Sequence, residues 1–143
     1  MTRTLPFFAL ALALAGCEPE PFSDCRTADG HDFEIVAVDT AAAAAFIEGD
    51  TLSVQVEYGG GCEEHAFVVC WPDGTFAESA PVQASLELWH GGLVDGCEAL
   101  LNETLELDLT PLKEAWHTSY GEGAGTISVN LAGASEPLVY SFE

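Results

Sequence analysis

Two histidines and an aspartate are the residues of this sequence whose types and spacing could form a chemical site. His65 opens one stretch of alternating apolar and polar residues, His90 closes another, and Asp95 follows soon after. With Glu63 as a further carboxylate, they would offer ligands suited to zinc or copper. No HExxH, paired CxxC or EF-hand calcium motif accompanies them. One interpretation is therefore a metal site at His65, His90 and Asp95. The other is a structural role, in which His65 is hydrogen-bonded at a strand end and His90 lies in a turn.

Motifs of nucleophilic or phosphate-handling enzymes do not occur in the sequence. Neither GxSxG nor SxxK is present, and abundant carboxylates do not by themselves supply an acid and base with separated pKa values. The glycines of the 121–125 segment precede a predicted strand, so they lack the helix N-terminus that a phosphate loop uses. We predict a non-catalytic protein with no cofactor.

Three tryptophans could form an aromatic platform for a ligand, although aromatic residues in strands more often pack in the core. Trp71 shares the parity of the predicted core face, Trp89 has the opposite parity, and Trp116 lies in a predicted helix.

Alternating apolar and polar residues predict seven short strands, and hence a mainly β fold, an antiparallel sandwich. The predicted strands are Phe33 to Val38, Thr51 to Tyr58, His65 to Trp71, Ala84 to His90, Thr104 to Leu109, Thr126 to Leu131 and Leu138 to Phe142.

Turn residues separate these strands. The predicted turns include Gly59-Gly60-Gly61, Pro72-Asp73-Gly74 and Gly91-Gly92. Thr110 as N-cap and Pro111 at the first helical position predict one short helix from Pro111 to His117 that ends near Gly121. The segment Ala41 to Ile47 fits either a helical turn or an irregular crossover.

The strands around His65 and His90 are expected to pair antiparallel, because the segment between them carries no helix signal. Both histidines then lie at one end of the sheet, at the rim of the core. Cys62 precedes the first of these strands and Cys97 follows the second, so these cysteines also come to that end.

The cysteine count after Cys17 is even, which predicts two disulfides in an exported protein. Cys62 and Cys70 lie roughly 26 Å apart along an extended strand, far beyond the roughly 7 Å limit for a bridge. Of the two remaining connectivities we predict Cys62 with Cys97, and Cys25 with Cys70.

The N-terminal residues indicate export. Arg3 precedes an apolar run from Leu5 to Ala15, too short for a transmembrane helix and typical of a signal peptide. The segment Leu14-Ala15-Gly16-Cys17 resembles the lipobox of bacterial lipoproteins. This resemblance implies cleavage before Cys17, attachment of diacylglycerol and a further acyl chain such as palmitate to that cysteine, and stable membrane anchoring. Glu18 stands where inner-membrane lipoproteins usually have Asp, which favours the outer membrane in a Gram-negative host.

The expected organisation is a signal peptide (1–16), a lipidated tether (17–24) and one β-sandwich domain (25–143), a common domain size. The chain has 24 acidic and three basic residues, with a net charge of −21. Such a surface repels nucleic acid and anionic headgroups. The one partner that the sequence predicts is the lipid bilayer, and the protein would reach it through the lipid on Cys17 rather than through its acidic surface.

The stretch Tyr58-Gly59-Gly60-Gly61-Cys62-Glu63-Glu64-His65, with Asp95-Gly96-Cys97 downstream, resembles an uncharacterised group of secreted lipoproteins with a Gly-Gly-Cys-x-x-His motif. The resemblance covers roughly residues 52–113 and implies the Cys62 to Cys97 bridge, without implying an activity. The favoured interpretation is a membrane-anchored, non-catalytic binding or structural module of the cell envelope. The alternative is a periplasmic or surface metal-binding protein that uses His65 and His90.

Overall fold

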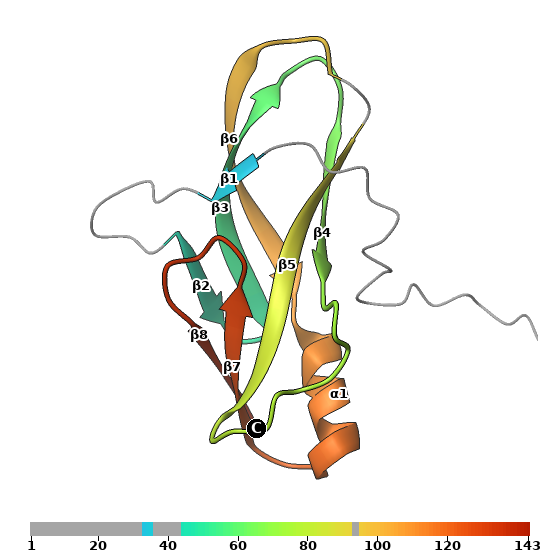
Figure 1. The fold of residues 1–143 in the computed structure, drawn as a ribbon, viewed down its shortest axis with the longest axis vertical. Helices are drawn as coiled ribbons and strands as arrows, with labels where there is room; N and C mark the ends of the chain where they lie inside the picture. The colour runs from blue at the N-terminus through green and yellow to red at the C-terminus, as the bar shows by residue number, and fades with distance from the viewer. Residues whose placement is uncertain (1–32, 36–43, 93–94) are drawn as a thin grey trace, which may run out of the picture.

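The computed structural model describes residues 33–35, 44–92 and 95–143, and it confirms a mainly β fold with two packed sheets and one helix (Figure 1). The elements are β1 (Phe33–Ile35), β2 (Ala45–Glu48), β3 (Thr51–Gly60), β4 (His65–Cys70), β5 (Val82–Gly92), β6 (Ala99–Asp108), α1 (Thr110–Tyr120), β7 (Gly125–Leu131) and β8 (Leu138–Phe142).

The first sheet is built around β3. β6 pairs antiparallel with β3 along its whole length, from Thr51 opposite Asp108 to Gly60 opposite Ala99. β2 and β1 pair antiparallel with the two halves of the other edge of β3. This long central strand reaches from the core of the molecule to the end where the disulfide lies.

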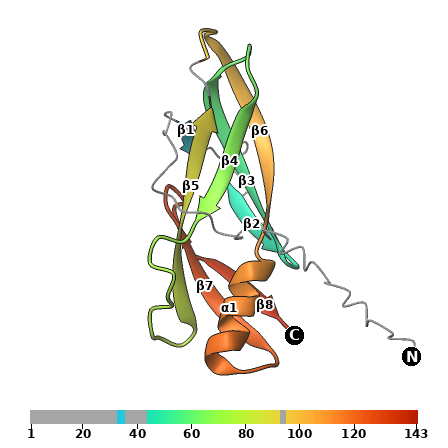
Figure 2. The same cartoon turned by 90° about the vertical axis from the view of Figure 1, so that its right-hand side faces the viewer.

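The second sheet has the order β4-β5-β7-β8. β4 pairs antiparallel with the second half of β5, as predicted, and β7 pairs with the first half of β5 in parallel. Parallel neighbours need a long crossover connection. Here β6, in the opposite sheet, and α1 supply it, as Figure 2 shows from the side.

The core lies between the two sheets and follows the alternation of the strands. Leu52, Val54 and Val56 of β3 are fully buried, and they face an equally buried set on the second sheet that includes Leu86 and Ile127. Burial of one such side chain contributes roughly 1.5 to 3 kcal/mol. Every second residue of these strands points into this core.

The helix closes one end of the sandwich. It runs from Thr110 to Tyr120, with Pro111 in its first turn and Gly121 after its last residue, close to the prediction. The N-cap is Leu109 rather than the predicted Thr110, and no side chain caps the helix; the Thr110 N–H donates to Asp108 Oδ1 at 2.8 Å.

A small polar cluster fastens α1 to the sheets. Lys113 on the helix donates to Asp50 Oδ2 at 2.6 Å, and the buried Tyr140 hydroxyl on β8 donates to Asp50 Oδ1 at 2.7 Å. These contacts hold the pKa of Asp50 below its usual range, and burial with the adjacent carboxylate raises that of Tyr140. Lys113 is thus engaged in the fold.

Several predicted boundaries differ from the structure. Gly59 and Gly60 are strand residues of β3, and Gly91 and Gly92 are strand residues of β5, although both runs were predicted as turns. β6 starts five residues before its predicted beginning. The undecided Ala41 to Ile47 segment ends in a strand, β2, which pairs with β3 across the Gly49 turn.

The predicted signal peptide, lipobox and tether lie outside the described residues, as do Cys25 and the end of the predicted Phe33 to Val38 strand. Within the described residues, no helix has the length and apolar character needed to cross a membrane.

Candidate functional site

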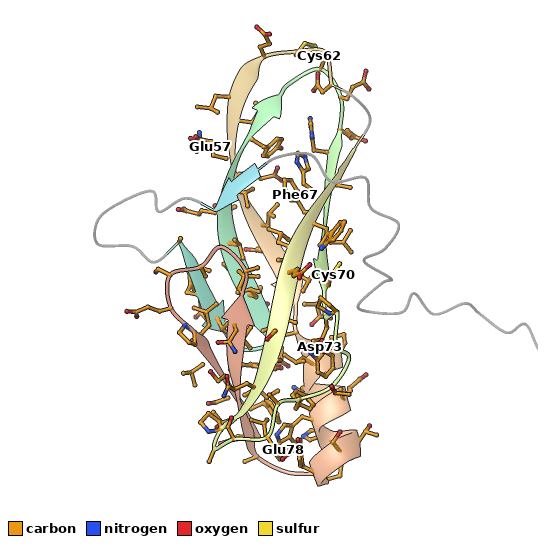
Figure 3. All side chains as sticks on the ribbon, viewed as in Figure 1. Glu57, Cys62, Phe67, Cys70, Asp73 and Glu78 are labelled. Carbon is orange, nitrogen blue, oxygen red and sulfur yellow. A yellow bond between two sulfur atoms is a disulfide. The ribbon has the colours of Figure 1, made fainter. Side chains whose placement is uncertain are left out.

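The predicted site residues come together at the end of the sandwich opposite α1. β4 and β5 place His65 opposite Gly92 and Phe67 opposite His90, so both histidines project from the same face near the same end. Asp95 follows β5 on the connection to β6. Figure 3 shows Cys62 at this end and Glu78 near the other.

Asp95 is the anchor of this cluster. Its Oδ2 accepts the backbone N–H groups of Gly61, Cys62 and Glu63 at 2.8, 2.9 and 3.1 Å, and its Oδ1 accepts that of Cys97 at 2.8 Å. Three successive N–H groups around one oxygen form an anion-binding nest. The bonds from the backbone N–H groups of Cys97 and Cys62, followed by that from His65, hold the pKa of Asp95 far below its usual range.

A hydrogen-bonded chain runs from Asp95 into the core. His65 Nε2 lies 3.1 Å from Asp95 Oδ2, and His65 Nδ1 lies 2.7 Å from His90 Nε2. Since the carboxylate only accepts hydrogen bonds, His65 Nε2 is the protonated ring nitrogen and its N–H donates a hydrogen bond to Asp95. In the neutral form, His65 Nδ1 then accepts from His90. The His65 and Asp95 side chains are 4% and 3% exposed, so the chain is shielded from solvent.

Aromatic rings enclose the two histidines. Phe67 stacks on His90 with ring centroids 4.4 Å apart, and Tyr58 lies 4.8 Å from His65 and 4.9 Å from His90. The Tyr58 hydroxyl donates to Glu103 at 2.8 Å, and burial together with this contact raises its pKa to about 12. His90 is 1% exposed. The histidines therefore sit within a packed end of the core, and a substrate could not reach His90 in this arrangement.

Gly60 is a residue of this site to which the sequence analysis gave only a turn role. A Cβ atom at this position would collide with the His65 ring and with Asp95 Oδ2, and its φ is +155°. The Gly59-Gly60-Gly61 run was predicted as a turn. Its actual role is to let the β3 backbone approach the imidazole and the carboxylate.

The predicted Cys62 to Cys97 disulfide is confirmed, with Cα atoms 5.8 Å apart. It joins the β3–β4 turn to the connection between β5 and β6, directly beside Asp95. Cys70 is disulfide-bonded too; because Cys25 lies outside the described residues, the Cys25 to Cys70 bridge remains a prediction.

The predicted metal ligands are adjacent, but their geometry is that of a hydrogen-bonded chain. Two nitrogens bound to one tetrahedral zinc would lie roughly 3.3 Å apart, whereas those of His65 and His90 are 2.7 Å apart. Asp95 faces the other nitrogen of His65. Within the described residues, the one group of three ligand-type side chains is Cys62, Asp95 and Cys97, and its two sulfur atoms are bonded to each other.

We expect Zn²⁺ to shift the melting temperature of the wild type and of a His65→Phe, His90→Phe variant equally. An ion held by these imidazoles would instead stabilise only the wild type, in proportion to the logarithm of its concentration over its dissociation constant. Thermal melts over a zinc series distinguish the two outcomes. A rise confined to the wild type would establish the metal-binding alternative.

A second cluster lies beside α1, at the other end of the molecule. A turn closed by a bond from the Gly74 N–H to the Trp71 carbonyl (3.1 Å) brings the β4–β5 loop back toward the helix. The Phe76 ring then lies 4.8 Å from that of Trp71 and 5.8 Å from that of Tyr120, tilted by 52° in both cases.

These rings border a surface hollow of about 310 Å³, which we call the aromatic hollow. Tyr120 donates from its hydroxyl to Glu78 Oε1 at 2.8 Å, so the polar rim is held in place by the loop and the helix together. The lining residues are Trp71, Gly74, Thr75, Phe76, Glu78, Ala115, Ser119 and Tyr120.

The three tryptophans do not form the single platform that the sequence suggested, because Trp89 lies on the other face of β5 from Trp71 and Trp116. Trp71 and Trp116 pack against the core, and Trp116 also lies 5.5 Å from Tyr120. Trp89 has the opposite parity on β5, as predicted, and donates to Glu87 at 2.9 Å. Trp71 instead lies in a cluster of rings with Phe76 and Tyr120, two residues that the sequence analysis did not identify.

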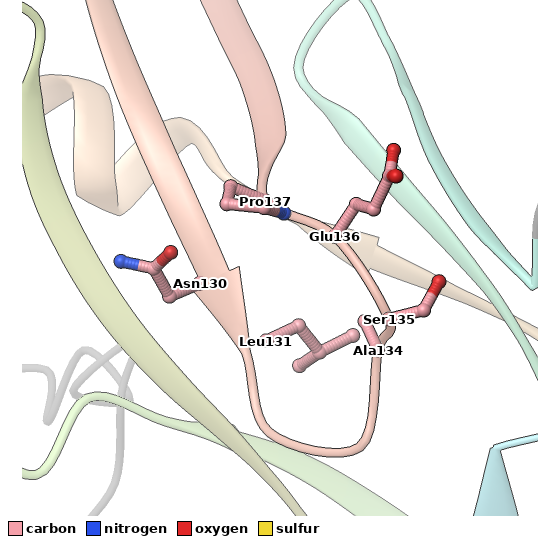
Figure 4. Close-up of a pocket in the computed structure, with 6 residues that line it drawn as sticks. All are labelled: Asn130, Leu131, Ala134, Ser135, Glu136 and Pro137. Atoms are coloured by element: carbon pink, nitrogen blue, oxygen red, sulfur yellow. The ribbon is translucent and has the colours of Figure 1, made fainter.

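Two other hollows carry less chemistry. The first, of about 110 Å³, lies within the β7–β8 hairpin; Figure 4 shows the polar ends of Asn130, Ser135 and Glu136 pointing away from Leu131 rather than toward a common point. The second, of about 220 Å³, lies over β3 and β6 and contains no aromatic side chain.

No family model matches the chain, and no curated protein matches it. The structure is similar to a crystal structure described as "Putative TOXIN related protein" from Parabacteroides distasonis ATCC 8503, with a TM-score of 0.45 and 15% identity. The match covers 78% of this chain and 50% of that one, so this chain spans about half its length.

Proposed function

We propose that this chain is a lipid-anchored, non-catalytic binding module of the bacterial cell envelope, and that its ligand occupies the aromatic hollow. The observation that carries the proposal is the convergence of three aromatic rings, Trp71, Phe76 and Tyr120, with the Glu78 carboxylate around one open hollow. Ligand sites are typically concave, with aromatic side chains and a few oriented polar groups in their lining, and this hollow has both.

The opposite end of the molecule has a structural role in this proposal. His65 bonds to Asp95 through one ring nitrogen and to His90 through the other, inside an aromatic enclosure beside the disulfide. A hydrogen-bonded side-chain network inside the core rigidifies the structure around it. In this proposal, the His65, His90 and Asp95 end stabilises the sandwich, and the end with the aromatic hollow binds the ligand.

Anchoring is supported by the sequence alone. The resemblance of Leu14-Ala15-Gly16-Cys17 to a lipobox implies a mature N-terminus held at a bilayer, with an acidic, proline-containing tether before the domain. A non-catalytic domain held in this way would capture its ligand near the membrane.

Binding at the aromatic hollow predicts that some small molecules will associate with the wild type and not with a Phe76→Leu variant. Saturation-transfer NMR with a mixture of cationic, neutral and anionic fragments measures this directly. Trp89→Leu, which removes an aromatic ring from the other face of β5, is the matched control and should bind as the wild type does. Equal responses from the wild type and Phe76→Leu would contradict the assignment of the hollow.

Lipid anchoring predicts that Cys17→Ser abolishes both processing and stable membrane association. The wild type should partition with membranes and carry a labelled fatty acid after metabolic labelling. Fractionation and label incorporation are compared in the two strains. Labelled Cys17→Ser protein would overturn the lipoprotein proposal without bearing on the hollow.

A further inference from the structure

We propose that the aromatic hollow binds an organic cation, a quaternary or methylated ammonium group, against the rings of Trp71, Phe76 and Tyr120 and beside the Glu78 carboxylate. This names the ligand class of the hollow and rests on the function proposed above.

The ring arrangement suits such a cation. An ammonium group is attracted to an aromatic face when it lies within about 6 Å of the ring centroid. The centroids of Trp71 and Phe76 are 4.8 Å apart and those of Phe76 and Tyr120 are 5.8 Å apart, and neighbouring planes are inclined by 52°. One cation can therefore lie within range of adjacent rings at the same time, which a single flat ring would not allow.

Glu78 supplies the compensating charge. Its Oε1 accepts the Tyr120 hydroxyl, and within the described part of the chain its second oxygen has no hydrogen-bond partner. The hydrogen bond to Glu78 raises the pKa of Tyr120, so the phenol stays neutral beside this carboxylate. The hollow thus combines neutral aromatic faces with a negative charge at its rim.

The charge of the rest of the molecule favours the same ligand. The chain carries 24 acidic and three basic residues. Lys113 is the one lysine or arginine among the described residues, and it is bound to Asp50. An acidic protein attracts cations and repels anions. A neutral sugar would gain nothing from this field.

The helix contributes to this field as well. Ser119 and Tyr120, which line the hollow, belong to the last turn of α1. The C-terminal end of a helix carries a partial negative charge that favours cations. The 310 Å³ volume is at the small end for ligand sites, which fits a compact ammonium head group rather than an extended ligand.

The test compares choline with 3,3-dimethylbutan-1-ol, which has the same shape without the charge. NMR titrations of the purified chain should show choline binding about tenfold more tightly than the alcohol, as expected for a partly desolvated cation–π site. Phe76→Leu and Glu78→Gln should each weaken choline binding several-fold. Glu87→Gln, which removes a carboxylate beside Trp89, should leave it unchanged. Glu78 is exposed, so its variant reports on binding rather than on folding.

Each result decides between distinct conclusions. Equal affinities for choline and the alcohol, both lost in Phe76→Leu, would overturn the cation and leave the hollow as a binding site for neutral ligands. Choline binding that is unchanged in both Phe76→Leu and Glu78→Gln would place the cation elsewhere on the acidic surface and overturn the inference. No binding of either compound, nor of any fragment in the NMR mixture, would remove the inference and the proposed function together.

Discussion

Replacing Cys62 and Cys97 together with alanine is expected to lower the free energy of unfolding by about 2 to 4 kcal/mol. The bond closes a loop between positions 35 apart in sequence, and its loss gives the unfolded chain more conformational freedom. The backbone N–H groups of both cysteines also bind Asp95, so the release of the two segments would loosen the nest around that carboxylate.

Chemical denaturation of the wild type and the double variant measures this difference. Ser85→Ala, at an exposed position on β5, is the control for a small substitution outside the core. Equal midpoints for wild type and double variant would show that the disulfide does not hold the end of the sandwich.

Asp95→Asn is expected to lower the melting temperature by several degrees near neutral pH, because an amide cannot accept the same set of charge-assisted hydrogen bonds from four backbone N–H groups and His65. The pKa of Asp95 is lowered in the folded state, so the folded protein binds the proton less readily than the unfolded chain does. The stabilisation is therefore complete above the unfolded value, about 3.9, and is lost as the pH falls through the lower folded value.

The difference in melting temperature between wild type and Asp95→Asn should accordingly be largest from pH 5 upward and shrink below about pH 4. Glu98→Gln is the matched control, since it removes the same charge from an exposed neighbouring position. In so acidic a chain, that change alone should relieve repulsion slightly. A pH-independent difference would show that Asp95 acts through packing rather than through its charge.

The predictions that succeeded concern patterns that repeat along the chain. The alternating pattern predicted that His65 and His90 lie on two neighbouring antiparallel strands, at the same end of the sheet. The pairing of these strands also predicted the Cys62 to Cys97 bridge. Such arguments hold because a strand projects every second side chain to one face. Once two strands are paired, the positions of their flanking residues follow.

Glycine was the main source of error. The sequence signal of Gly60 and Gly91 is that of a turn, since glycine is favoured where the backbone must reverse. In the structure both lie in strands, and Gly60 is required by a close approach of His65 and Asp95. The contact with Asp95 joins residues more than thirty positions apart, so no local pattern could reveal it.

The sequence predicted only part of the aromatic hollow, because its residues are also far apart along the chain. Trp71 stood out by residue type, but Phe76 and Glu78 come from a loop and Tyr120 from a helix that begins well beyond it. Their meeting depends on the packing of the β4–β5 loop against α1, which is a property of the topology. The alternation of apolar and polar residues along a strand does not predict where α1 packs.

The most direct measurement of the central claim is the location of a bound ligand. Assigned ¹H–¹⁵N spectra, recorded with the tightest-binding fragment, should show perturbed amides confined to residues 71–78 and 115–120, which border the aromatic hollow. Perturbations centred on residues 61–65 and 95–97 would instead place the binding site at the His65, His90 and Asp95 end and contradict the account.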